Sequence, residues 1–443
     1  MRDMTTGTPR GHLWRYALPL LLGSGLQLCY NAVDSIIAGR FIGREALAAE
    51  GIAGPVMNLV ILAVTGMCIG AGVLMSEAFG AKDLAKLRKT LAETLRFGAV
   101  LCCAATALGV ILTPAILRMM TVPAEIQGIT TLYLRVIFLG TPFTFFYNAL
   151  STALKSVGDS KTPLKFLAFS SILNAVLDLI FLGWFGFGIL CSAVTTVVAE
   201  AVSALLAGGY MLRRFGEFFP GREDWGHDRQ LLGKILSYGA PAALQQAIMP
   251  IGKILIQGQI DLLGVNVIAA FNAVTRVDDF ACIPEMSLSS AISTYIAQNR
   301  GAEKPQRVRP GLRAGIRLEV GYWVFIACAV TLLRGPIVAL FVTGDGAEEI
   351  VALGSRYLGY MAFFYLIPAL NNSFQGFYRG MGKMYTAMTG TLIQITVRTV
   401  STILLAPSRG IVGVAFACGA GWLCMLLFEM PYYFITCRKK ALT

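Results

Sequence analysis

The sequence contains little charge and almost no histidine. Asp, Glu, Lys and Arg make up only 14% of its residues, against 56% hydrophobic residues, and the only histidines are His12 and His227. A chain this apolar cannot cover a soluble globule with water-binding side chains, which excludes an ordinary soluble domain. Two distant histidines also exclude a histidine metal cluster, a Ser-His-Asp arrangement and an HExxH motif. We therefore expect neither enzyme activity nor a cofactor.

Nucleotide and nucleic-acid motifs are also absent. The sequence has no GxGxxG or GxxxxGK[ST] loop and no CxxC pair, although it contains 47 glycines and 10 cysteines. Most cysteines fall inside apolar runs, where they serve as small packing residues. The net charge of +12 comes without basic and aromatic residues interleaved. We therefore predict loops beneath anionic lipid headgroups and no nucleic-acid partner.

Long apolar runs dominate the sequence, whose mean hydropathy is +0.66. Each crossing of the hydrocarbon core needs about 20 apolar residues, and the pattern predicts twelve of them. The predicted spans are 13–38, 46–78, 93–118, 129–154, 163–183, 187–212, 231–260, 267–297, 311–333, 350–378, 384–406 and 410–437. The N-terminus has no small-residue cleavage site, so we expect an uncleaved first helix.

The second half of the sequence repeats the first. Gly43, Ala48-Ala49 and Gly80-Ala81 recur at one constant spacing as Gly264, Ala269-Ala270 and Gly301-Ala302. At a slightly wider spacing, Tyr133-Leu134 and Gly158 recur as Tyr357-Leu358 and Gly382. Duplicated helical bundles are typical of transporters.

The distribution of positive charge predicts the orientation. Of the 37 Lys and Arg residues, 27 fall at loops on one side, and only Arg40, Arg44, Arg118, Arg334 and Arg409 fall in the opposite loops. By the positive-inside rule, both termini are cytoplasmic.

Six spans in each copy give both copies the same direction. We therefore expect an all-α integral membrane protein with twelve transmembrane helices in two six-helix lobes, related by a pseudo-twofold axis along the membrane normal. The predicted domains are an N-terminal lobe (1–212), a cytoplasmic linker (213–230) and a C-terminal lobe (231–443).

Two acids, Asp34 and Asp178, stand inside predicted spans of the first copy and have no acidic counterparts in the second. A charge at the centre of a membrane helix costs about 2.5 to 3.5 kcal/mol on insertion scales, so such acids usually have a function. Asn174 is four residues before Asp178, and both side chains therefore project from one face of a helix. Carboxylate and amide oxygens suit a hard cation, and a buried pair of carboxyls can hold a proton. The alternative for each acid is a structural carboxylate bonded to nearby polar groups.

Four segments carry a resemblance to a known family. They are YNAVDSIIAGRFIG (30–43), NAVLDLIF (174–181), TRVDDFACIPEMSLSSA (275–291) and AQNRGAEK (297–304), the last being the counterpart of SEAFGAKD (76–83). In this order and at these spans, the chain resembles the multidrug and toxic compound extrusion (MATE) transporters over essentially its full length.

The resemblance implies a polar site in the N-terminal lobe. Matched residue by residue, it would consist of Asp34, Asn174, Asp178 and Thr196, and it would bind a coupling ion, either a proton or sodium; these residues are metal ligands only if the ion is sodium. Thr195 is an alternative to Thr196. Some family members carry acids in spans 7 and 10, where this sequence has glutamines and asparagines. That difference favours the DinF-like or MepA-like bacterial branches.

Further residues are candidates for lining a substrate pocket. Gln27, Tyr30 and Asn31 lie within two turns of Asp34, although helix packing explains them equally well. Lys253 and Arg398 are cations inside predicted spans of the second copy. Each either pairs with an acid such as Asp261, Asp278, Asp279 or Glu285, or faces the substrate path and favours an anionic substrate. We expect Glu200, Glu319 and Glu429 near the membrane interfaces and assign them no role.

Together these features predict a secondary-active exporter of multiple toxic organic compounds, driven by inward movement of protons or sodium ions. Its partners would be a small organic substrate and the lipid bilayer, and we expect a monomer in the bacterial inner membrane. The alternative function is that of a flippase of the same superfamily, which moves lipid-linked oligosaccharides. Such a flippase would require a wide basic cleft, and the cations Lys253 and Arg398 are consistent with this alternative.

Overall fold

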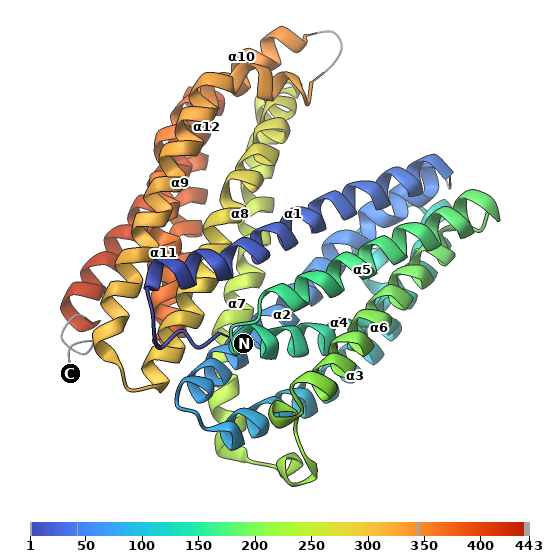
Figure 1. Cartoon of the computed structure of the whole chain (residues 1–443). Helices are drawn as coiled ribbons and strands as arrows, with labels where there is room; N and C mark the ends of the chain where they lie inside the picture. Colours follow the sequence, from blue (N-terminus) through green and yellow to red (C-terminus); the bar gives the residue numbers. More distant parts are fainter. Residues whose placement is uncertain (1, 42, 343–345, 438–443) are drawn as a thin grey trace. The chain divides into compact units, whose positions relative to one another are not determined.

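The computed structural model of the protein describes residues 2–41, 43–342 and 346–437 (Figure 1). These residues are almost entirely helical, and no strand occurs among them. Arg438 to Lys440, which we assign to the cytoplasmic side, lie outside the described residues. The helices are α1 (Pro9–Phe41), α2 (Arg44–Gly80), α3 (Leu84–Met119), α4 (Ala124–Ser156), α5 (Lys161–Asp178), α6 (Ile189–Arg214), α7 (Arg229–Ile260), α8 (Val265–Gly301), α9 (Pro305–Ala339), α10 (Ala347–Phe364), α11 (Leu366–Gly380) and α12 (Met384–Tyr432).

The number of membrane-crossing segments follows from helix length and two breaks. Within the described ranges, eight helices are long and apolar enough to cross a membrane, or nine if α10 and α11, which bend by 46°, form one broken span. Helix α12 contains two helical runs that meet at Gly410, where φ is 56°. Helices α7 and α8 are not among these candidates, although they have 32 and 37 residues. Counting α10 with α11 as one segment and α12 as two, the described helices supply twelve segments, and the predicted all-helical membrane fold is confirmed.

Large apolar side chains cover much of the outer surface. Ile111, Leu205, Leu332, Phe363 and Leu404 are all more than two-thirds exposed. In water so many exposed large apolar side chains would promote aggregation. Next to lipid tails, the exposure of these apolar side chains has no free-energy cost. The backbone polar groups are hydrogen-bonded within the helices and therefore need no water.

The repeat seen in the sequence is reproduced in the backbone. Helices α2 and α8 both contain 37 residues and begin after a glycine with positive φ, Gly43 at 103° and Gly264 at 96°. A side chain at this φ would be strained, so glycine is required at both turns. Both helices end in the same way: the N–H of Asp83 donates to Ala78 O at 2.9 Å, and the N–H of Lys304 donates to Asn299 O at 2.9 Å.

The chain forms two compact units that exchange short segments. Unit 1 comprises Met1–Asp3 and Pro19–Ala243, and unit 2 comprises Met4–Leu18 and Leu244–Thr443. Helix α1 therefore passes from unit 2 to unit 1 at Pro19, and α7 passes from unit 1 to unit 2 just after Pro241. Proline removes a backbone hydrogen bond and permits a bend in a helix. The lobe boundaries predicted from the sequence thus differ from those of the compact units.

The exchanged segments pack closely. In unit 1, a side chain at Gly70 of α2 would collide with the backbone of Gly239 in α7, so the two helices touch through small residues. In unit 2, Tyr16 of α1 lies with its hydroxyl 3.1 Å from Thr294 Oγ1 in α8.

The segment predicted as a linker is folded onto unit 1. It contains two short 3-10 turns, Gly216–Phe218 and Arg222–Trp225. Phe218 is buried, and Arg88 of α3 donates to Asp224 at 3.0 Å. This contact holds the segment against α3.

Candidate ion-binding site

A buried polar cluster in unit 1 begins at the C-terminal end of α5. Asn174 and Asp178 lie one turn apart on this helix, and their side chains are 1% and 0% exposed. The chain after Asp178 continues as a π-helix over Leu179–Trp184. Such widened turns are rare and occur frequently at functional sites. The packing of α5 against α6 places these two side chains next to Thr195 and Thr196.

Both ends of the Asp178 carboxylate are engaged. The hydroxyl of Thr195 donates to Asp178 Oδ1, and it also lies 2.8 Å from the carbonyl of Ser192. When the Asn174 amide is oriented to satisfy both of its ends, Nδ2 donates to Asp178 Oδ2 and to the Tyr30 hydroxyl, each at 3.0 Å. In that orientation Asn174 Oδ1 accepts the backbone N–H of Thr196 at 3.1 Å. A buried carboxylate needs such donors to avoid a large desolvation penalty.

Helix α1 brings the second carboxyl group to the cluster. Asp34 is half-buried, and its side chain lies within hydrogen-bonding reach of Asp178. Two carboxylates this close cannot both be ionised without strong repulsion, so a proton held between them is the stable arrangement. The pair can therefore bind and release a proton.

The structure brings together Asp34, Asn174, Asp178, Thr196 and Tyr30. It does not bury Gln27 and Asn31, the other two residues of α1 that we considered, which are exposed. Lys253 and Arg398 belong to unit 2. Among the described residues, no group of three or more His, Cys, Asp or Glu side chains is placed to hold a metal ion.

Sequence reasoning missed two acids near this cluster. Glu50 of α2 interacts electrostatically with Asp34 and Asp178, and its Oε1 atom has no hydrogen-bond partner among the described residues. Glu200 of α6, which we expected at a membrane interface, accepts a hydrogen bond from Thr144 of α4. Both acids interrupt apolar runs, which is the signal that identified Asp34.

Glu319 and Glu429, which we expected near a membrane interface and to which we assigned no role, are 1% and 0% exposed within unit 2. Glu429 accepts a hydrogen bond from Gln375, whereas neither carboxylate oxygen of Glu319 has a partner in the described part of the chain.

The two cations of unit 2 lie beside acids. Lys253 Nζ is 2.8 Å from Asp279 Oδ1, and both side chains are about half exposed. Arg398 interacts electrostatically with Asp278, whose carboxylate accepts hydrogen bonds from Tyr357 and Tyr365. Each cation thus has the structural partner that one of our two interpretations requires.

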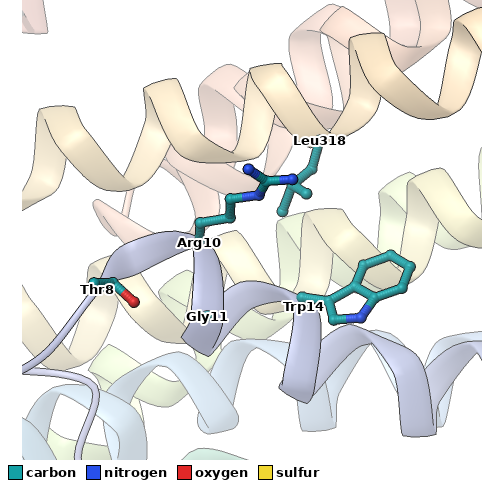
Figure 2. A pocket seen from close by; sticks show the side chains of 5 residues that line it. All are labelled: Thr8, Arg10, Gly11, Trp14 and Leu318. Carbon is teal, nitrogen blue, oxygen red and sulfur yellow. The ribbon is translucent and has the colours of Figure 1, made fainter.

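Figure 2 shows a pocket of about 550 Å³ in unit 2, lined by Thr8, Arg10, Gly11, Trp14 and Leu318. Arg10 and Trp14 are exposed on the first turns of α1. A tryptophan beside a basic residue is typical of the membrane–water interface. The pocket has no residue in common with the carboxyl cluster of unit 1.

A family model matches each half of the chain. The MatE model matches residues 19–180 and again residues 241–404, which together make up most of the sequence. The chain belongs to the MatE family, and proteins of this family with known structures are membrane transporters. The family expected from the sequence motifs is therefore confirmed.

Similar proteins match most or nearly all of the chain. The probable multidrug resistance protein YpnP of Bacillus subtilis is 28% identical over 434 residues, covering 97% of this chain and 96% of that protein. An FAD transporter of Shewanella oneidensis is 24% identical over 343 residues, or 76% of this chain and 75% of its own length.

Solved structures share the fold. A MATE protein in complex with MaL6 superposes with a TM-score of 0.92 at 21% identity, with 99% of both chains covered. A MOP superfamily transporter from Pyrococcus furiosus gives a TM-score of 0.89 at 20% identity, covering 99% of this chain and 97% of its own.

Proposed function

We propose that the protein is a secondary-active exporter of toxic organic compounds, driven by protons that enter through the carboxyl cluster of unit 1. One observation carries this proposal: Asp178 is fully buried and within hydrogen-bonding reach of a second carboxyl, Asp34. A carboxyl pair inside a membrane helix bundle is costly to keep charged and is therefore suited to binding a proton. The relatives named as multidrug resistance proteins support the substrate class.

The hydrogen bonds within the carboxyl cluster favour a proton over sodium as the coupling ion. A metal ion in this cluster would need several free oxygen atoms, because hard cations are held by oxygen ligands. The Asn174 amide instead presents its N–H donors to Asp178 and Tyr30, and its oxygen accepts a backbone N–H. An N–H donor aimed at the carboxylate stabilises the ionised form that remains when the proton leaves.

Helix α1 offers a route from proton binding to movement. It carries Asp34 in unit 1 and contains Pro19 at the point where the chain passes from unit 2 to unit 1. A helix lacking a hydrogen bond at this point bends with little resistance. We propose that protonation of the Asp34–Asp178 pair changes the bend of α1 and thereby expels the substrate.

The alternative, a flippase for lipid-linked oligosaccharides, depends on free positive charge in unit 2. Lys253 lies within 2.8 Å of Asp279, and Arg398 interacts with Asp278. These neighbouring acids reduce the charge available for an anionic substrate, so we propose drug export instead. We also propose that the protein acts as a monomer in the bacterial inner membrane with both termini in the cytoplasm, in keeping with the positive charges of its loops.

Ethidium efflux from reconstituted vesicles tests the proposal. The wild type should export ethidium when a proton gradient is imposed, and Asp34→Asn should not, because an amide cannot carry the proton. A sodium gradient alone should drive no export. The control is Asp261→Asn, which removes an acid of unit 2 that is hydrogen-bonded to Gln257 on the protein surface; it should export like the wild type.

Two results would contradict the proposal. Export by Asp34→Asn at the wild-type rate would show that this carboxyl does not couple transport. Absence of export by the wild type under both gradients, with lipid-linked oligosaccharide moved between leaflets instead, would favour the flippase.

A further inference from the structure

Two of the buried acids of unit 2, Glu285 and Glu319, have no role in the function proposed above. Glu285 stands in the middle of α8 and Glu319 near the middle of α9, and their side chains are 0% and 1% exposed. A carboxyl at such a position is expensive in the membrane interior, and residues of this kind usually bind an ion or a proton.

The packing of α8 against α9 places the two acids opposite each other. The two helices contact each other at successive positions: Gly311 faces Tyr295, Gly315 faces Ile292, and Tyr322 donates to the carbonyl of Ala281 at 2.9 Å. Glu319 lies between the last two of these positions on α9, and Glu285 lies between them on α8, so the two acids face each other. The electrostatic interaction of Glu319 with Glu285, and of both with Tyr322, agrees with this placement.

The carboxyl oxygens lack partners among the described residues. Asn372 of α11 donates to Glu285 Oε2 at 3.2 Å. Glu285 Oε1 and both oxygens of Glu319 have no hydrogen-bond partner in the described part of the protein. A buried polar atom without a partner is destabilising, and an ionised one more so. The arrangement therefore calls for a further positively charged species at this position.

Comparison with unit 1 indicates that the space for Glu319 is specific to unit 2. In the alignment of the repeats that pairs Gly264 with Gly43, Glu319 corresponds to Gly98, against which the ring of Phe145 packs so closely that a Cβ atom could not fit. In the later part of the repeat, where Gly382 pairs with Gly158, Phe145 corresponds to Ala369 of α11. Replacing a phenylalanine by alanine leaves room for a longer side chain from the facing helix, which is where Glu319 stands.

No cation of the protein neutralises the two acids in the described structure. The titratable and charged groups around them are Cys282 of α8, Tyr322 of α9, Tyr365 between α10 and α11, and Arg379 of α11. Arg379 donates to Ser289 Oγ at 2.9 Å and to the carbonyl of Gln375 at 3.3 Å, and its electrostatic partner is Glu429. Two adjacent carboxylates without a counter-ion in the membrane interior would repel each other and lose hydration.

We propose that Glu285 and Glu319 form a second proton-binding site, in unit 2, separate from the Asp34–Asp178 pair. A proton fits better than a metal ion, because the side chain that is bonded to the pair in the described part of the chain, Asn372, presents an N–H donor rather than an oxygen. Proton binding here can be measured without transport. If no proton is bound at Glu285 and Glu319, the proposed export function is therefore not affected.

Infrared spectroscopy of the purified full-length protein tests this site through the carbonyl stretch of protonated carboxyl groups. At pH 7 the double variant Glu285→Gln/Glu319→Gln should lose the signal of at least one protonated carboxyl relative to the wild type. That signal should disappear from the wild type as the pH is raised to 10, because a carboxyl that can exchange its proton with the solvent loses it when protons become scarce. The matched control is Glu348→Gln/Glu349→Gln, which removes two exposed acids of α10 and should leave the signal at pH 7 unchanged.

A second variant replaces the two carboxyl residues of unit 2, and the alanine that faces them, with the residues that unit 1 has at the corresponding positions. Glu285→Val/Glu319→Gly/Ala369→Phe reproduces the residues Val64, Gly98 and Phe145 of the first repeat. It decides the question if the glutamine variant does not fold, and it should show the same loss. An unchanged signal at pH 7 in whichever variant folds, or a wild-type signal that persists to pH 10, would overturn the proposal.

Discussion

Units 1 and 2 share one backbone plan but place their buried acids at different positions. In unit 1, Asp178 stands where the repeat has Thr402 in unit 2. In unit 2, Glu319 stands where unit 1 has Gly98. Helix lengths and the glycine turns before α2 and α8 agree between the copies. Backbone geometry is therefore set by helix ends and turns, and buried charge is free to differ without disturbing it.

The two units also differ at one position where unit 1 has a neutral side chain and unit 2 has a cation. Asn174 of unit 1 corresponds to Arg398 of unit 2, which interacts with Asp278. Thr402, the counterpart of Asp178, donates its hydroxyl to the carbonyl of Arg398 at 2.8 Å within its own helix. The guanidinium of Arg398 and the Thr402 hydroxyl, which is bonded within its own helix, provide no binding site for a cation. Under our proposals, unit 2 therefore binds a proton at a different place, at Glu285 and Glu319.

The largest expected effect comes from removing the acid that distinguishes unit 1. Asp178→Asn should reduce proton-driven ethidium efflux to the rate measured without a gradient, because the amide cannot exchange a proton with Asp34. The matched change in unit 2, Thr402→Val, removes only a hydroxyl bonded to its own helix and should leave efflux unchanged. Equal loss in both variants would mean that the two positions have a common structural role.

A smaller effect should follow from making unit 1 resemble unit 2 at the position of Glu319. Gly98→Ala adds a Cβ atom where the ring of Phe145 already packs, and overpacking of this kind costs about 1 to 3 kcal/mol. The midpoint of thermal unfolding in detergent should fall, and adding Phe145→Leu should restore part of the loss. The control is Gly321→Ala in α9, which has open space around it and should be neutral or slightly stabilising. An unchanged midpoint for Gly98→Ala would contradict the packing on which the comparison depends.

Much of the fold could be predicted from the sequence, because it follows from local signals. Apolar runs long enough to cross a membrane and repeated glycine turns determine the helices and their order. The bend between α10 and α11 and the break at Gly410 in α12 were not anticipated. The exchange of segments between the units at Pro19 and after Pro241 was not predicted either, since contacts between distant helices leave no periodic signal.

The site was predictable in part for the same reason. Asp34 and Asp178 stand out because acids are rare in apolar helices. The sequence could not decide between Thr195 and Thr196, because adjacent residues on a helix point in directions about 100° apart. In the structure both contribute: the Thr195 hydroxyl donates to Asp178, and the backbone N–H of Thr196 donates to Asn174. Glu319 was assigned no role, because its burial depends on the packing of α9 against α8, which leaves no signal in the sequence.

The smallest effect concerns this pair of threonines. Thr195 donates its hydroxyl to Asp178, whereas Thr196 provides its backbone N–H to Asn174, a contact that a valine side chain leaves in place. Thr195→Val should therefore shift the pH midpoint of efflux, because it removes a hydrogen bond to a buried carboxylate worth about 1.5 kcal/mol, roughly a tenfold change in proton affinity. Since the lost bond stabilises the ionised form, proton affinity should rise and the midpoint should move to higher pH. Thr196→Val should move it less. A larger shift with Thr196→Val would mean that its hydroxyl, which lies 3.4 Å from the Asn174 amide, contributes more to proton binding than the hydroxyl of Thr195.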